Sequence, residues 1–420
     1  MDKGFLNPLN WIKKWLIRYI KYNSKQIKIN NYEVKLYSAI KYANFIKESK
    51  QEISHEQVKN PQVSFITTIF NQENYLPNFI FSVQNQKLKK YELICVDDFS
   101  EDKSIKIIKK IKEKDKRIKL IRNKNNMGAL YSRYIGELYA NGEFIIFIDC
   151  EDLVMENGIF NSYKYLKRNN IDIIQFHIIK QDKNRIFISN FSNTYKKTIY
   201  QPYLSYVHYY NIENKKGAEY NYYLWNKLIK REIVNKAFKW MGKKFLKEKI
   251  LMHNDCIILF SLLRKANSYK YLDEIGYYYF RSNKNSTSSF VKNYKKSNEI
   301  LHGLFTNIKF LYEKTDNTYL DKYFCIYKVQ YYYNFSKKLF KYLNDKELAF
   351  ITKILNKLID SDYISIEDKS NIIMVKTLIL KKVETQEDWV AFLISMINMK
   401  HNLQLFKYIF IFLNDISAIL

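Results

Sequence analysis

The stretch GEFIIFIDCED, residues 142–152, decides the fold that the sequence predicts. Five consecutive apolar residues, 144–148, show no helical periodicity and are followed directly by acidic residues. A short, continuous apolar run of this kind is typical of a strand that is buried on both faces of a parallel sheet. Residues 144–148 are therefore expected to form such a strand, with polar side chains gathered at its carboxyl end.

An alternation of strands and helices precedes this stretch, and it begins after Pro61. The expected strands are further short apolar runs, at residues 63–69, 92–96 and 118–121. The expected helices carry apolar residues at helical spacing, at residues 76–83, 101–111 and 129–140. Ser100 is expected to cap the second of these helices, whose first turn holds Glu101 and Asp102. Strands separated by helices predict an α/β domain built on a parallel sheet.

The composition excludes several classes of protein. With 420 residues, 47% of them hydrophobic, the chain has enough apolar material for a sizeable core, which excludes disorder along its whole length. Its four cysteines form no C-x-x-C pair, which argues against a disulfide framework and a zinc ribbon and favours a reducing compartment.

The formal charge of +28 raises the question of a polyanionic partner. Only nine of the 70 basic residues are arginine, the residue best suited to bidentate recognition of phosphates and bases, and the lysines are spread evenly along the sequence. The charge therefore indicates a bias in composition rather than a nucleic-acid surface, and nucleic acid is not expected as a partner.

The N-terminal segment has the pattern of an amphipathic helix. Its apolar face is made of Trp11, Ile12, Trp15, Leu16, Tyr19 and Ile20, and its basic face of Lys14, Arg18, Lys21 and Lys25. This pattern fits two locations, a helix packed on the protein's own core and a peripheral contact of residues 11–25 with a membrane surface. No signal peptide is recognised, and no run reaches the roughly 18 apolar residues that a spanning helix needs. The expected location is the cytoplasm or the cytoplasmic face of a membrane.

Polar side chains follow three of the expected strands. The first strand has Thr68 near its end and is followed by Asn71, the second is followed by Asp97 and Asp98, and the one at 144–148 by Asp149, Glu151 and Asp152. In a parallel sheet these strand ends meet at one edge, where ligands bind. Clustered carboxylates repel one another unless a cation or hydrogen bonds satisfy them, and an oxygen-only ligand set favours Mg²⁺ or Mn²⁺ held together with substrate phosphates. Capping of the following helices is the alternative for Asp97 and Asp98.

Four motifs in matching order and spacing resemble the family 2 glycosyltransferases with the GT-A fold. They are VSFITTIFN at 63–71, VDDFSED at 96–102, NMGALYSR at 126–133 and GEFIIFIDCED at 142–152. Weaker similarity continues in WNKLIKRE at 225–232, HND at 253–255 and the aromatic-Arg-Ser segment at 277–288. The resemblance implies a Rossmann-like, mostly parallel sheet flanked by helices over residues 62–290. A basic N-terminal segment and linker, residues 1–61, and a helical C-terminal domain, residues 291–420, are expected around it.

The resemblance also implies roles for individual residues. Asp98 is expected to bind the nucleotide base with Thr68 beside it, and Asp149 and Glu151 take the first and third places of the D-x-D motif that positions the ribose and the metal. Asp255 matches the catalytic base. Two positions depart from the family pattern, because Glu151 stands where Asp is usual and Asn254 where Glu is usual.

Further candidates complete the predicted site. Asn71, Asp97 and Arg133 are expected to contact the nucleotide sugar, and Asp152 and Lys227 are additional candidates, with a structural position at a helix end as the alternative for Lys227.

The expected function is an inverting, metal-assisted transfer of a sugar from a nucleotide diphosphate, with UDP favoured, to a glycan, lipid or protein acceptor. A catalytically silent relative that binds sugar nucleotides or serves as a scaffold is the first alternative, because of Glu151 and Asn254. A nucleotidyltransferase is the second, but the loop after the first strand lacks the glycine and lysine that such enzymes place there.

Overall fold

The computed structural model describes residues 53–182, 185–188, 199–200, 202, 223–250 and 254–280, with single positions at 303, 306, 307, 310, 313 and 314. The chain divides into two compact units, residues 1–206 with 215–292 and residues 207–214 with 293–420. The helices and strands below all belong to the first unit. The predicted amphipathic helix at residues 11–25 lies outside the described residues, as does nearly all of the predicted domain at 291–420.

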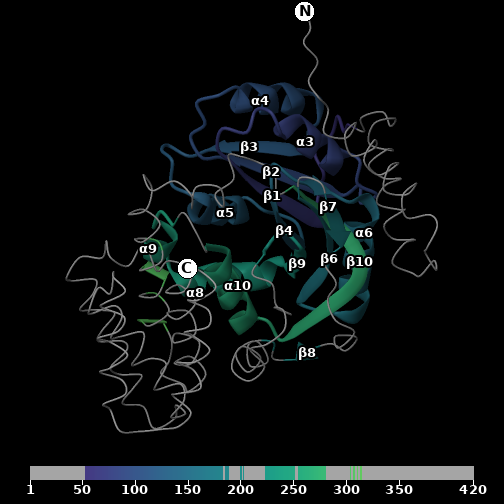
Figure 1. Cartoon of the computed structure of the whole chain (residues 1–420), viewed down its shortest axis with the longest axis vertical. Coiled ribbons are helices and arrows are strands. Elements are labelled where there is room, and N and C mark those ends of the chain that lie inside the picture. The colour runs from purple at the N-terminus through teal and green to yellow at the C-terminus, as the bar shows by residue number, and fades with distance from the viewer. Residues whose placement is uncertain are drawn as a thin grey trace, which may run out of the picture. The chain divides into compact units, whose positions relative to one another are not determined.

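Four parallel strands form one half of a mixed sheet, in the order β3-β2-β1-β4 (Figure 1). They are β1 (Val63–Ile69), β2 (Tyr91–Asp97), β3 (Ile118–Arg122) and β4 (Phe144–Asp149). Every residue of β2 is buried, as are the first five residues of both β1 and β4, as expected for strands covered on both faces. The strands predicted from apolar runs are confirmed.

The other half of the sheet brings in strands that the apolar runs did not predict. They are β5 (Leu153–Val154), β6 (Ile173–Asp182), β7 (Arg185–Ile188), β8 (Ile199–Tyr200), β9 (Lys227–Lys230) and β10 (Ser268–Phe280). Strand β9 runs antiparallel to both β4 and β6, and β6 pairs in parallel with β10. The short strands β5 and β8 pair antiparallel with β10, and β7 with β6.

Helices connect and flank the strands (Figure 1). They are α3 (Leu76–Gln84), α4 (Ser104–Lys114), α5 (Ala129–Leu138), α6 (Glu156–Asn169), α8 (Arg231–Met241), α9 (Lys243–Leu246) and α10 (Asn254–Lys265). Helix α5 packs on β1 and β2, and a Cβ at Gly136 would overlap Cγ2 of Ile66. This close approach fixes the helix that carries Arg133 against the centre of the sheet. Among the described residues, no helix is both long enough and apolar enough to cross a bilayer.

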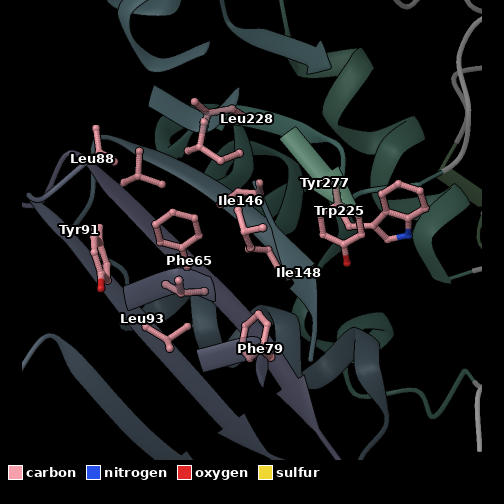
Figure 2. Packing of buried hydrophobic residues seen from close by; sticks show 14 of the residues in the cluster. Phe65, Phe79, Leu88, Tyr91, Leu93, Ile146, Ile148, Trp225, Leu228 and Tyr277 are labelled. Atoms are coloured by element: carbon pink, nitrogen blue, oxygen red, sulfur yellow. The ribbon is translucent and has the colours of Figure 1, made fainter. Parts of the chain in front are cut away.

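The core is built from buried residues of the strands and of the helices that pack on them (Figure 2). Phe65 of β1 meets Tyr91 of β2 edge to face, with ring centroids 5.4 Å apart. Farther along the sheet, Trp225 stacks on Tyr277 of β10 with centroids 4.7 Å apart. Because this stack lies beside the end of β4, the aromatic core continues up to the edge where the predicted site lies.

The predicted cap at Ser100 is wrong. Helix α4 begins at Ser104, and the side chain that accepts the Ser104 backbone N–H, at 2.9 Å, is that of Asp102. The Ser100 hydroxyl instead accepts the Asn71 backbone N–H at 3.0 Å, and Asp102 accepts that of Glu73 at 2.9 Å. Residues 100–102 are therefore used to tie the loop after β2 to the loop after β1, which delays the start of the helix.

Candidate active site

The carboxyl ends of β1, β2 and β4 meet at one edge of the sheet. Thr68 stands in register with Val96 on one side and with Asp149 on the other. The Asp98 backbone N–H donates to the Ile69 carbonyl at 2.7 Å, which continues the pairing one residue beyond the strands. The predicted side chains at these three strand ends are thus brought together as the sequence indicated.

Asp98 organises the loop that leads into α5. Its Oδ1 accepts hydrogen bonds from the Asn123 amide and the Met127 backbone N–H, both at 2.8 Å, and its Oδ2 accepts the Gly128 N–H at 2.7 Å. Gly128 has φ of +86°, a conformation that favours glycine. A carboxylate oxygen accepts about two hydrogen bonds, so Oδ2 retains capacity for one more donor. Sequence reasoning missed Asn123, whose role depends on a partner 25 residues away.

Asp97 and Asn71 contact the protein's own loops. Asp97 is fully buried, accepts the Ser100 backbone N–H at 3.2 Å and pairs with Arg122 at 3.3 Å. The Asn71 side-chain oxygen accepts the Glu101 N–H at 2.9 Å, and Asn71 has a positive φ of 53°. These contacts hold the two loops at the edge of the site, and capping of α4 by Asp97 is excluded because that helix begins seven residues later.

Arg133 joins two predicted site residues from different elements. It extends from α5 and donates from Nη2 to Asp149 Oδ1 at 3.2 Å and from Nη1 to Asp255 Oδ1 at 2.7 Å. Nη1 also donates to the side-chain oxygen of Asn254, at the start of α10. The Arg133 side chain is 7% exposed, whereas Asp149 and Asp255 are 32% and 26% exposed. The two carboxylates therefore remain open to a ligand while the guanidinium lies behind them.

The charges of this cluster act on one another. Desolvation raises the pKa of Asp149, and the neighbouring Asp255 acts in the same direction, while Arg133 opposes both. Burial disfavours the charged form of Arg133, but Asp255 and Asp149 raise the pKa of its guanidinium above the ordinary value. The arginine therefore stays charged, and it limits the repulsion between the two carboxylates.

The turn after β4 is anchored by Tyr277 of β10. The Tyr277 hydroxyl accepts the Asp149 backbone N–H at 3.2 Å and donates to Asp152 Oδ2 at 2.8 Å. Burial raises the pKa of Tyr277 well above its ordinary value, with Asp152 and Asp149 adding to the effect. Asp152 is fully buried in this contact, while Cys150 is buried with its Sγ 3.4 Å from the Thr68 carbonyl oxygen. Sequence reasoning missed Tyr277 because its partners lie more than 120 residues earlier.

The predicted metal ligands Asp149 and Glu151 lie at the end of β4 and on the turn that follows it. Glu151 is partly exposed and lies near Tyr75, whose pKa is raised by burial and by the Glu151 charge. Within the part of the chain that the structure describes, no three His, Cys, Asp or Glu side chains gather as a metal site. Two carboxylates on one turn fit the way Mg²⁺ and Mn²⁺ are commonly held, in which substrate phosphates and water complete the coordination.

Lys227 lies at the start of β9 and is fully buried, so the prediction of a position at a helix end is wrong. Its ammonium donates to the Tyr223 carbonyl at 2.5 Å and to the Asn226 side-chain oxygen at 2.9 Å. Burial lowers its pKa well below the ordinary value, against the opposing effect of Asp255. Lys227 therefore lies behind the site, within electrostatic range of Asp255.

Comparisons with known proteins place this fold in a class. The structure is similar to a crystal structure of Staphylococcus aureus TarS, residues 1–349, in complex with UDP-GlcNAc, with a TM-score of 0.52 at 16% sequence identity over 76% of this chain and 91% of that one. The domain therefore has the GT-A fold of glycosyltransferases. Residues 64–238 match the family model "Glycosyl transferase family 2", so this part of the chain is similar to that family, as the sequence motifs indicated.

Curated relatives agree with the family. An uncharacterised glycosyltransferase of Haemophilus influenzae is 38% identical over 111 residues, which cover 26% of this chain and 44% of the relative. A cholesterol galactosyltransferase of Borreliella burgdorferi is 29% identical over 287 residues, which cover 66% of this chain and 75% of the relative. The chain spans about half the length of several of these relatives, including 44% of the first and 48% of a Methanocaldococcus jannaschii glycosyltransferase.

Proposed function

We propose that this chain transfers a sugar from a UDP-linked donor to an acceptor hydroxyl with inversion at the sugar carbon. The observation that carries the proposal is the pairing of Asp149 and Asp255 through one guanidinium, with both carboxylates partly exposed. Asp149 ends β4, and Asp255 lies in the first turn of α10, which reaches the same edge of the sheet from far along the chain. This arrangement supports a role for Asp149 on the nucleotide side and for Asp255 as the base of a single displacement.

In this mechanism each group has one task. Asp98 and Thr68 receive the nucleotide base, and Asp149 and Glu151 receive the ribose and diphosphate side of the donor. A divalent metal held by Asp149 and Glu151 would stabilise the negative charge that develops on the leaving diphosphate, so the leaving group would need no proton donor. The acceptor hydroxyl attacks the anomeric carbon from the face opposite the diphosphate and gives its proton to Asp255. One displacement from the opposite face inverts the configuration.

The acceptor and the place of reaction remain predictions. A glycan, a lipid and a protein all offer hydroxyl groups, and the basic segment at residues 11–25 is the feature that would favour a lipid surface. We likewise propose that the chain is organised as an N-terminal segment at residues 1–61, a catalytic domain at 62–290 and a helical domain at 291–420. The choice of UDP is supported by the structure of TarS, which was solved with UDP-GlcNAc, so UDP is the first nucleotide to test.

Calorimetric titration tests the proposal without an identified acceptor. We expect UDP to bind the full chain at one site in the presence of Mn²⁺, with a Kd between about 1 µM and 1 mM, the usual range for enzyme substrates. GDP and CDP serve as matched ligands that keep the diphosphate and change the base. Binding of GDP in place of UDP would overturn the choice of nucleotide, and no binding of any of them would overturn the proposed function.

A further inference from the structure

Arg133 has its guanidinium directed at side chains of the protein. Nη1 donates hydrogen bonds to Asp255 Oδ1 at 2.7 Å and to the side-chain oxygen of Asn254, and Nη2 donates to Asp149 Oδ1 at 3.2 Å. Among the described residues, no other cation forms an ion pair with either of these carboxylates. Arg133 thus contacts three residues of the site, and its predicted contact with the nucleotide sugar stays a prediction.

The charges explain why an arginine is needed here. Two neighbouring carboxylates that lose part of their hydration repel each other unless a cation lies between them. One guanidinium against two carboxylates leaves the cluster with a net charge of −1, because Asn254 contributes a neutral amide. A planar guanidinium presents separate N–H groups to two partners at once, whereas a lysine ammonium is a single point of charge.

We propose that Arg133 is a positioning residue that sets the place of Asp255 relative to Asp149, and so fixes the base opposite the bound donor. This inference rests on the proposed function, because it assigns Asp149 to the donor and Asp255 to the acceptor. Arg133 precedes Asp149 by 16 positions and Asp255 by 122. No local element therefore sets the distance between the Asp149 and Asp255 side chains. The arginine, held on α5 against the sheet, supplies that connection.

A double-mutant cycle tests whether Arg133 acts through Asp255. The assay is hydrolysis of UDP-GlcNAc at saturating donor with Mn²⁺, in which water takes the place of the acceptor. We expect Arg133→Lys to lower kcat about 10- to 100-fold, since small displacements of a reacting group cost this much. In the Asp255→Asn background the same change is expected to cost no more than about threefold, because the group that it positions has already lost its function.

Arg117→Lys is the matched control. Arg117 is buried to the same degree as Arg133 and pairs with Asp115 at 2.7 Å, among residues that lie outside the predicted site. We expect Arg117→Lys to lower the Tm but to leave kcat within about twofold of wild type in both backgrounds. A loss of kcat in Arg133→Lys that is matched by Arg117→Lys would show only damage to the fold and would overturn the inference.

Additivity is the other result that contradicts the inference. If Arg133→Lys lowers kcat by the same factor in the wild-type background and in the Asp255→Asn background, the arginine does not act through the base. If Arg133→Lys does not fold, Asn254→Ala replaces it in the cycle, with an expected loss of about 2- to 10-fold that disappears in the Asp255→Asn background. Failure of wild type to bind UDP and to hydrolyse UDP-GlcNAc would instead overturn the proposed function itself, so the two failures are distinguishable.

Discussion

Asp255→Asn is expected to leave UDP affinity within about threefold of wild type while it slows sugar transfer by about 10²- to 10⁴-fold. In the wild-type chain Arg133 donates to Asp255 Oδ1 at 2.7 Å. The amide keeps the size of the side chain and retains an oxygen that accepts this hydrogen bond. It removes the group that takes the proton of the acceptor. Because the base faces the acceptor and not the nucleotide, affinity and turnover are expected to change independently.

Asp172→Asn provides a control for the same chemical change elsewhere in the domain. Asp172 is buried and pairs with Lys230 at 2.7 Å, near the start of β6. Its replacement is expected to reduce thermal stability and to leave the turnover of the folded protein at the wild-type level. Transfer at the wild-type rate by Asp255→Asn would show that another carboxylate is the base and that the match of residues 253–255 to the family motif is mistaken.

Glu151→Ala is expected to weaken UDP binding about 10- to 100-fold in Mn²⁺ and to lower transfer by a larger factor. In the proposed site, loss of this carboxylate leaves Asp149 as the remaining protein ligand of the metal. A metal held there would contribute to donor binding and to stabilisation of the leaving diphosphate, so both quantities are expected to fall together. Calorimetry with UDP and steady-state turnover measure the two effects separately.

Chelation with EDTA is the matching experiment on the wild-type chain. EDTA is expected to bring UDP affinity down to that of Glu151→Ala, and to change the affinity of the variant little. Equal binding of UDP by wild type with and without a divalent metal would contradict the role of Glu151 and leave Asp149 to act on the ribose alone.

The parallel half of the fold could be predicted from the sequence because its strands are continuous apolar runs. Residues 63–69, 118–121 and 144–148 carry the pattern of buried strands, and each lies in a strand of the structure. Strand β9 could not be recognised in the same way. It has four residues, two of them lysine, and it is a strand because it lies antiparallel between β4 and β6.

The sequence predicts the positions of candidate site residues that lie at strand ends, but not the contacts that depend on distant side chains. Asp98 and Asp149 follow apolar runs, so topology alone places them at one edge. Asn123 and Tyr277 have no such signal, since each acts by a hydrogen bond to a residue brought near by the fold. Arg133 was recognised as a site residue, but its partners Asp149 and Asp255 could be identified only from the structure.

The most direct test of the single-displacement account is the anomeric configuration of the first sugar released. Proton NMR of the reaction with UDP-α-GlcNAc and Mn²⁺, recorded before mutarotation, reads this configuration without an identified acceptor. Attack from the face of Asp255, opposite the diphosphate, predicts β-GlcNAc as the first product. Release of α-GlcNAc, or no release from a chain that binds UDP, would contradict the account.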